Sequence, residues 1–389
     1  MSTIKVNKIE NTNTADGGVA IDSSGHVQVD GVQMPTAGAL SNRNLVVNGG
    51  MQVAQRGTSS TTSGFGTVDR FQNVYVGGTK TQSQGSLTSG SPFDEGFRNY
   101  LRVTNTTAGS AAASEYNLII TRIEAQDVAN SGWNYPSASS YITLSFWVRA
   151  SVSQEYLGYF RAYDGTSRNY PFSLGTLTAD TWTKVTKTVP GNSGLTINDD
   201  NGTGLELTIA PFLGTNFTAS GTSLNAWRTY APDSERLPDM TSTWATTASS
   251  TFDLTGVQLE VGEKATPFEH RSFGDELARC QRYYVKHSAT STALYARLLP
   301  IGHMTSSSVL RFHPKLNPPM RAVPTYNQSG TFSTAPSVGT PALSLETESS
   351  TVDRLSLADS TGISGTGGNA VVMYVNNDAD AFVEFSAEL

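Results

Sequence analysis

The sequence predicts a mainly β protein, and three observations point to that fold class. Hydrophobic residues make up 37% of the 389 residues and aromatic residues 9%, which is enough for packed cores. These residues recur in short bursts with a period of two, as in strands that bury one face. Glycines and serines between the bursts supply the turns. A chain of this length is expected to hold two or three domains, each with its own core.

Residues 1–40 are expected to form a separate segment of short strands. Three apolar pairs alternate along it, between Asp-Gly and Ser-Gly turns: Ile4/Val6, Val19/Ile21 and Val27/Val29. Strands of three to five residues are not stable alone in water. The segment is therefore predicted to pack against copies of itself or against another protein, with residues 32–40 as a linker. A tail without fixed structure is the alternative.

Residues 41–271 are predicted to form one β-sandwich of the jelly-roll type. The clearest strand is YITLSFWVRA (141–150), whose alternate residues share a core face: Ile142, Leu144, Phe146 and Val148. Further strands are expected in EYLGYFRAYDG, TWTKVTKTV and GLELTIAPF. RIEAQDVANSG, which begins at Arg122, is expected to form a short helix or turn at the sandwich edge.

The strand that begins at Phe252 changes phase in its middle. Phe252 and Leu254 keep one phase, whereas Val257 and Leu259 keep the opposite one. An extra residue at Gly256 would restore one continuous buried face, and glycine suits such a position. The pattern therefore predicts a β-bulge at Gly256.

A linking helix is predicted at residues 272–284. Ser272 and Asp275 have the spacing of a capping box, and Leu277, Cys280 and Tyr284 recur at helical spacing.

Residues 285–389 are predicted to form a C-terminal β domain that carries the receptor-binding tip. Its strands are expected in ALYARLL (293–299), SVLRFH, AVVMYV and AFVEFSAEL. A Ser/Gly/Thr-rich loop at 357–369 is expected to be exposed at the end of this domain, where binding residues tend to lie.

Several classes of protein are disfavoured by composition. The net charge is -7 and no basic cluster exceeds a pair, so nucleic-acid binding is not expected. No segment approaches 18 apolar residues, so membrane insertion is not expected. The N-terminus MSTIKVNKIE lacks the apolar core of a signal peptide, which indicates assembly in a cytoplasm.

No cofactor or metal is expected either. The single cysteine, Cys280, excludes a disulfide framework within the chain and a Cys-based zinc site. The five histidines are scattered without the spacing of metal ligands. Asp199-Asp200 and Asp378/Asp380 are interpreted as turn residues, with calcium loops as the alternative.

Aromatic side chains are the best candidates for ligand contact. Trp147, Tyr159 and Tyr163 fall on the non-core phase of their strands, and Arg149 lies beside Trp147. Two more aromatic residues, Trp133 and Tyr135, stand in the SGWNYPS loop. Aromatic rings edged by polar groups match the flat C–H faces of sugars. The alternative is that these rings pack against a neighbouring subunit or the second sheet.

Three stretches resemble bacteriophage tail-fibre and receptor-binding proteins: FDLTGVQLEVGEKATPFEHRSFGDELARCQRYY (252–284), NRNLVVNGGMQVAQRGTSS with VDRF (42–71) and TRIEAQDVANSG with YITLSFWVRA (121–150). The third also resembles the carbohydrate-binding jelly rolls appended to glycosidases, and the opening STIKVNKIENT resembles the particle-attachment segments of marine-phage fibres.

The resemblance implies a homotrimeric tail fibre or spike on the virion, assembled in the host cytoplasm. Its N-terminus would dock on phage tail or adaptor proteins, and its C-terminal domain would bind a host surface polysaccharide or lipopolysaccharide. A capsid or tail decoration protein without receptor binding is the first alternative. A polysaccharide depolymerase is less favoured, because such enzymes usually carry long repeating β-helices and this chain has no internal repeat. An enzyme is therefore not expected.

Overall fold

The computed structural model describes residues 8–10, 18–21, 27–29, 32–33, 42–231 and 234–389. The chain divides into two compact units, 1–271 and 272–389. No helix in the described part of the chain has the length and hydropathy of a membrane span.

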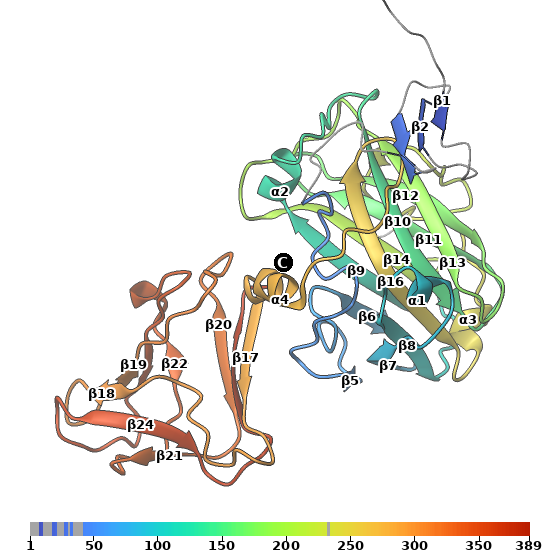
Figure 1. Cartoon of the computed structure of the whole chain (residues 1–389). Helices are drawn as coiled ribbons and strands as arrows, with labels where there is room; N and C mark the ends of the chain where they lie inside the picture. The colour runs from blue at the N-terminus through green and yellow to red at the C-terminus, as the bar shows by residue number, and fades with distance from the viewer. Residues whose placement is uncertain (1–7, 11–17, 22–26, 30–31, 34–41, 232–233) are drawn as a thin grey trace, which may run out of the picture. The chain divides into compact units, whose positions relative to one another are not determined.

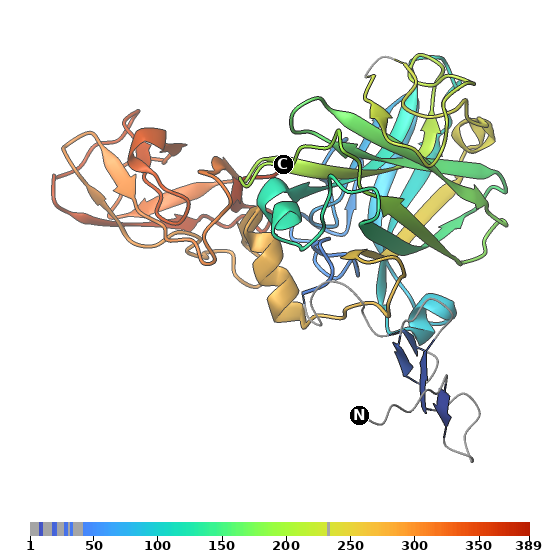
Figure 2. The same ribbon diagram turned by 90° about the horizontal axis from the view of Figure 1, so that it is seen from above.

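The first unit contains two six-stranded antiparallel sheets (Figures 1 and 2). The first sheet has the order β13 (Thr183–Pro190), β10 (Tyr141–Ala150), β16 (Thr251–Val261), β8 (Asn99–Thr107), β7 (Thr79–Ser86) and β5 (Ser59–Ser60). The second has the order β15 (Arg228–Thr229), β12 (Arg168–Thr176), β11 (Glu155–Ala162), β14 (Thr203–Leu213), β9 (Tyr116–Glu124) and β6 (Gln72–Val76). Short helices are α1 (Ser91–Asp94), α2 (Ala125–Ala129) and α3 (Thr243–Thr246).

The main core lies between these two sheets, so the predicted mainly β fold with a sandwich is confirmed. Phe146 of β10 and Phe160 of β11, one from each sheet, are at most 1% exposed and belong to the same apolar cluster. The predicted core face of β10 is confirmed, and each of the other three expected strands of the sandwich is present. The short helix expected at the sandwich edge is α2, which lies against β9 and β14.

The predicted bulge at Gly256 is confirmed. Pairing between β10 and β16 runs through Ser145–Gln258 and then Trp147–Thr255, so two residues of β16 face one of β10. Gly256 has φ +65°, and a Cβ there would lie 2.7 Å from the ring of Phe97. Glycine therefore permits both the left-handed backbone and the close ring.

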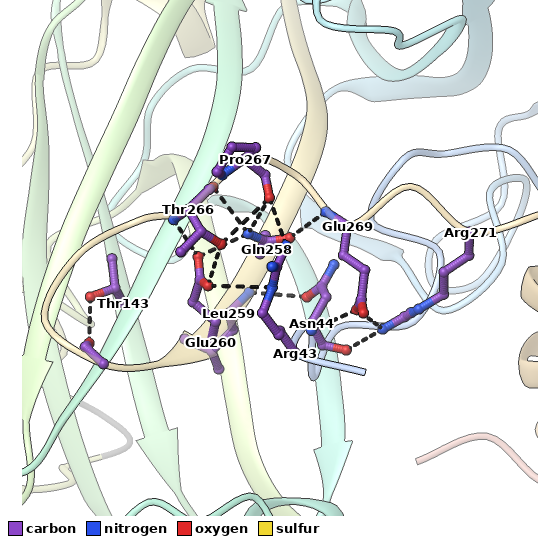
Figure 3. A network of polar contacts seen from close by, with 11 residues as sticks. Arg43, Asn44, Thr143, Gln258, Leu259, Glu260, Thr266, Pro267, Glu269 and Arg271 are labelled. Carbon is purple, nitrogen blue, oxygen red and sulfur yellow. Dashed lines mark hydrogen bonds and ion pairs between the residues drawn. The ribbon is translucent and has the colours of Figure 1, made fainter. Parts of the chain in front are cut away.

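The beginning and the end of the sandwich are joined by hydrogen bonds (Figure 3). The side chain of Asn44 donates to the carbonyl of Val257 over 3.0 Å and accepts from the amide of Leu259 over 3.1 Å. The amide of Asn44 donates to the Glu269 carboxylate over 3.0 Å, and Arg271 donates to the Asn44 carbonyl over 2.5 Å. Asn44 thus holds the start of the sandwich against β16.

A buried carboxylate holds the loop that follows β16 (Figure 3). Glu260 is 2% exposed and accepts from the Thr266 amide over 2.8 Å and from the Thr266 hydroxyl over 2.6 Å. Gln258 donates to the same carboxylate over 2.8 Å and accepts from the amide of Glu269 over 2.8 Å. Gln258, Glu260 and Thr266, three polar residues of the 252–284 motif, are therefore hydrogen-bonded inside the protein.

The N-terminal strands form a four-stranded meander of β1 (Lys8–Glu10), β2 (Gly18–Ile21), β3 (Val27–Val29) and β4 (Val32–Gln33). The expected strands at Val19/Ile21 and Val27/Val29 are confirmed, while Ile4/Val6 and most of the predicted linker lie outside the described residues. Five apolar side chains of the meander are between 38% and 64% exposed: Ile9, Val19, Ile21, Val27 and Val29.

The second unit contains two further antiparallel sheets around its own core. One has the order β17 (Tyr284–Ser288), β25 (Phe382–Ser386) and β20 (Thr325–Ser329). The other has the order β21 (Phe332–Ala335), β24 (Ala370–Val375), β18 (Gly302–Met304), β19 (Leu310–Phe312), β23 (Leu357–Asp359) and β22 (Ser344–Leu345). A 3₁₀ helix, η1, spans Thr347–Ser349.

The linking helix is shorter than predicted. Helix α4 spans Phe273–Gln281, and the Ser272 hydroxyl accepts from the Asp275 amide, as the capping box requires. Tyr284 belongs to β17 instead, because its backbone pairs with Ser386 of β25. Side-chain spacing alone does not reveal this pairing.

Two predictions for the C-terminal domain are wrong. Residues 293–299 form turns instead of a strand, and the amides of Ala293 and Ala296 bond to carbonyls three residues back. The predicted loop 357–369 begins with strand β23, whose residues are buried between β19 and β22. The loop proper is 360–369.

Candidate functional site

Two of the six predicted ligand residues lie against the main core. Trp133 is 3% exposed, and its Nε1 donates to the carbonyl of Ser140 over 3.3 Å. Tyr135 packs against the same core and donates its hydroxyl to the carbonyl of Ile197 over 3.3 Å. These rings hold their own loop onto the sandwich.

Two others lie on the outer face of the second sheet. Tyr159 is 2% exposed in a small apolar cluster that includes Leu237, and burial raises its pKa. Tyr163 is half-buried and donates its hydroxyl to Glu206 Oε2 over 2.7 Å. Burial, and then the charge of Glu206, raise the pKa of Tyr163 to about 12.

The last two, Trp147 and Arg149, lie together on the outer face of the first sheet. Trp147 is 9% exposed and packs beside Phe97, and its Nε1 donates to Glu95 Oε2 over 3.0 Å. Arg149 is two residues further along β10, where the face is more open. The structure thus brings this predicted pair into one site.

Strand pairing places three charged residues in a row across this face. Arg149 pairs with Asp253, and Asp253 pairs with Arg102, on β10, β16 and β8. Arg102 reaches both oxygens of Asp253, at 2.7 and 2.9 Å, and Arg149 reaches Oδ2 twice, at 2.9 and 2.7 Å. The Asp253 side chain is fully buried, whereas those of Arg102 and Arg149 are 32% and 25% exposed. The hydrogen bond from Arg102 to Asp253 raises the pKa of Arg102.

Two half-buried aromatic rings flank this row. The rings of Tyr100 and Trp182 are 5.8 Å apart at an interplanar angle of 77°. The guanidinium carbon of Arg149 lies 4.7 Å from the Trp182 ring and 5.7 Å from the Tyr100 ring. A Cβ on Gly85 would lie 2.2 Å from the Tyr100 ring, so this glycine lets the ring lie across β7. We call Tyr100, Arg102, Arg149, Trp182 and Asp253 the aromatic–arginine face.

A cleft of about 680 Å³ adjoins this face. Lys184, the strand partner of Trp147, donates to both oxygens of Glu95, at 3.0 and 2.9 Å. The His270 Nε2 lies 2.8 Å from the Glu95 carbonyl. Residues that line the cleft include Glu95, Lys184, Thr186, Lys264, Phe268 and His270.

This arrangement suits a neutral polyhydroxylated ligand. Ring edges offer apolar contact, and the arginines, held by Asp253, are fixed donors beside them. Sequence reasoning missed Tyr100, Arg102, Trp182 and Asp253. Strand alternation places each of them off the core, but the site appears only when the order β13-β10-β16-β8 is known.

Similarity searches found no matching family model and no matching curated protein. Solved structures that match part of this chain include the enzymatically active domain of tailspike protein 4 of bacteriophage CBA120. It has 11% identity and a TM-score of 0.31, and the match covers 56% of this chain and 21% of that chain.

Carbohydrate-binding modules are also among the similar structures. TmCBM61 in complex with β-1,4-galactotriose has 8% identity and a TM-score of 0.27, and the match covers 57% of this chain and all of that one. The N-terminal cellulose-binding domain of Cellulomonas fimi β-1,4-glucanase C has 12% identity and a TM-score of 0.26, and the match covers 55% of this chain and 99% of that one. At these values the likenesses carry no argument about what this chain binds.

Proposed function

We propose that this chain is a non-catalytic structural protein of a phage tail fibre or spike, and that it binds a glycan on the host surface. The observation that carries the glycan assignment is the aromatic–arginine face. It combines half-buried rings with arginines whose geometry is fixed before any ligand arrives. The fibre assignment is supported by the three sequence stretches that resemble phage fibres.

The proposed binding mode follows from the row across the sheet. A pyranose ring lies against Trp182 and Tyr100, and its hydroxyls accept from the exposed N–H groups of Arg102 and Arg149. Because Asp253 satisfies each guanidinium from beneath, neither arginine must reorganise on binding. The adjoining cleft accommodates further sugar units.

The test is a screen of neutral host polysaccharides followed by calorimetry with the best oligosaccharide. We expect Trp182→Ala to weaken binding about fivefold, since stacking on an aromatic ring contributes about 1 kcal/mol. Phe273→Ala is the matched control, because Phe273 is 58% exposed but belongs to the second unit. If Trp182→Ala binds like the unaltered chain, the assignment of this face is wrong.

The proposal includes a homotrimer held partly by the N-terminal meander. Ile9, Val19 and Val29 lie opposite one another in register and are exposed. Burial of such a face stabilises association. We expect a Val19→Lys/Val29→Lys variant to lose the trimer in light scattering, whereas Gln28→Lys, on the opposite face of β3, keeps it. If light scattering shows that the unaltered chain is a monomer, the proposed homotrimer is wrong.

The proposed docking of the N-terminus on tail or adaptor proteins has its own test. A chain without residues 1–40 should fold but fail to enter phage particles.

A second location for the receptor site is the C-terminal domain, as the sequence analysis predicts. The exposed ring of Tyr295 lies 6.5 Å from that of Tyr374, on the same unit as the 360–369 loop. Loss of host-cell binding in Tyr295→Ala, but not in Trp182→Ala, would favour this location.

A further inference from the structure

The outer face of the second sheet also carries a row of charged residues. Pairing aligns Arg161 of β11 with Glu206 of β14, and Glu206 with Arg122 of β9. These strands are neighbours in the second sheet, away from the aromatic–arginine face (Figure 1). Tyr163, at the end of β11, and Tyr230 lie beside this row.

Arg161 is held against two tyrosine rings. Its guanidinium carbon lies 4.0 Å from the centre of the Tyr163 ring and 3.8 Å from that of Tyr230. Cation–π contacts at these distances are favourable, and they fix the plane of the guanidinium. Arg236 lies 5.7 Å from the same Tyr230 ring, so a second positive charge is close.

The hydrogen bonds of Arg161 use only part of its donor capacity. Nε donates to the Ser167 hydroxyl over 3.0 Å, and Nη1 donates to the Tyr163 hydroxyl over 3.2 Å. A guanidinium has five N–H groups, so the edge formed by Nη1 and Nη2 retains donors. The side chain is half-buried, and this edge is fixed by the two rings.

The neighbouring carboxylate is engaged elsewhere. Glu206 is 3% exposed and accepts from Arg122 Nε over 2.8 Å, from the Tyr163 hydroxyl over 2.7 Å and from the Thr208 hydroxyl over 3.1 Å. Within the described part of the chain, no carboxylate lies within ion-pair distance of Arg161. Arg161 is thus a half-buried cation without an anionic partner among these residues.

A planar donor edge beside tyrosine rings selects one kind of ligand. Two parallel N–H groups match the two oxygens of a carboxylate, and the rings match the C–H face of a sugar. We infer that Arg161, Tyr163 and Tyr230 form a binding site for the carboxylate of an acidic sugar, such as a uronic acid. This site is independent of the proposed neutral-glycan face.

The test compares trigalacturonic acid with its fully methyl-esterified form, which has the same sugar rings without the charge. Calorimetry uses the full chain at low salt. We expect the acid to bind at least about tenfold more tightly than the ester, and Arg161→Gln to remove that preference. Arg161→Lys keeps the positive charge but loses the paired donors, so we expect it to lose most of the preference too.

The matched control is Arg354→Gln, which neutralises an exposed arginine of the second unit and should leave the preference intact. Thermal melting verifies that each variant is folded, and Arg161→Lys still tests the site if Arg161→Gln does not fold. Equal binding of acid and ester by the unaltered chain overturns the inference. So does a preference that survives in a folded Arg161 variant. The Trp182→Ala result bears on the other face alone.

Discussion

The two sheets of the sandwich carry the same charge pattern on their outer faces, but they use it differently. Each row is an arginine, a carboxylate and an arginine on neighbouring strands: Arg149, Asp253 and Arg102 in the first sheet, Arg161, Glu206 and Arg122 in the second. In the first sheet both arginines bind the carboxylate. In the second only one does.

The difference teaches that strand register alone does not determine ion pairing. The Tyr163 hydroxyl donates to Glu206 and accepts from Arg161 Nη1. The Ser167 hydroxyl accepts from Arg161 Nε. These two hydroxyls divert Arg161 from the carboxylate. In the first face both arginines are therefore paired with the carboxylate, whereas in the second Arg161 is not.

The largest effect is expected from Asp253→Asn. The substitution removes the charge that both arginines share and leaves two cations together, with the amide nitrogen facing donors. Loss of a partner from a buried ion pair costs about 3 kcal/mol or more of unfolding free energy. Urea unfolding measures this change in unfolding free energy. A decrease below about 1 kcal/mol would show that solvent screens the charges of these arginines.

Glu206→Gln is expected to cost less, about 2 kcal/mol, because Glu206 binds only one arginine and accepts two hydroxyl hydrogen bonds. The same urea experiment ranks the two carboxylates. If Glu206→Gln proves the more costly, the distinction between the two rows fails.

Tyr163 should make stability depend on alkaline pH. Its folded-state pKa of about 12 lies above the ordinary tyrosine value, so its contribution is complete below pH about 10 and is lost as pH rises to about 12. We expect Tyr163→Phe to be about 1 kcal/mol less stable at neutral pH. Its stability should also fall less between pH 10 and 12. Equal slopes for both proteins would contradict the assignment.

The smallest effect is expected from Asp180→Asn. Asp180 is exposed, and its charge raises the pKa of Arg102 only as the weakest of several causes. Exposed pairs contribute little, so the change should stay below about 0.5 kcal/mol. This substitution is the control for Asp253→Asn, since both remove an acid near Arg102.

Alternation and glycine placement were sufficient to predict much of the sandwich. The core phase of β10 and the bulge at Gly256 follow from residues close in sequence. In contrast, Tyr284 and residues 293–299 were assigned wrongly because distant partners decide their structure. Local periodicity does not contain that information.

The candidate site was predicted only in part, for the same reason. Trp147 and Arg149 share a strand, so alternation placed them together. Asp253 lies 104 residues from Arg149 and 151 residues from Arg102, and only strand order unites them. Gln258, Glu260 and Thr266 of the 252–284 motif, in contrast, make contacts that hold the fold.

The junction around Asn44 also has a mechanical consequence. Asn44 stands near the start of the sandwich and is hydrogen-bonded to Glu269 and Arg271 at its end (Figure 3). Tension applied along the chain between residues 42 and 272 therefore acts first on these few bonds, and the strands of the sandwich are shielded from it. A protein pulled at both ends would yield here while the two sheets of the sandwich stay folded.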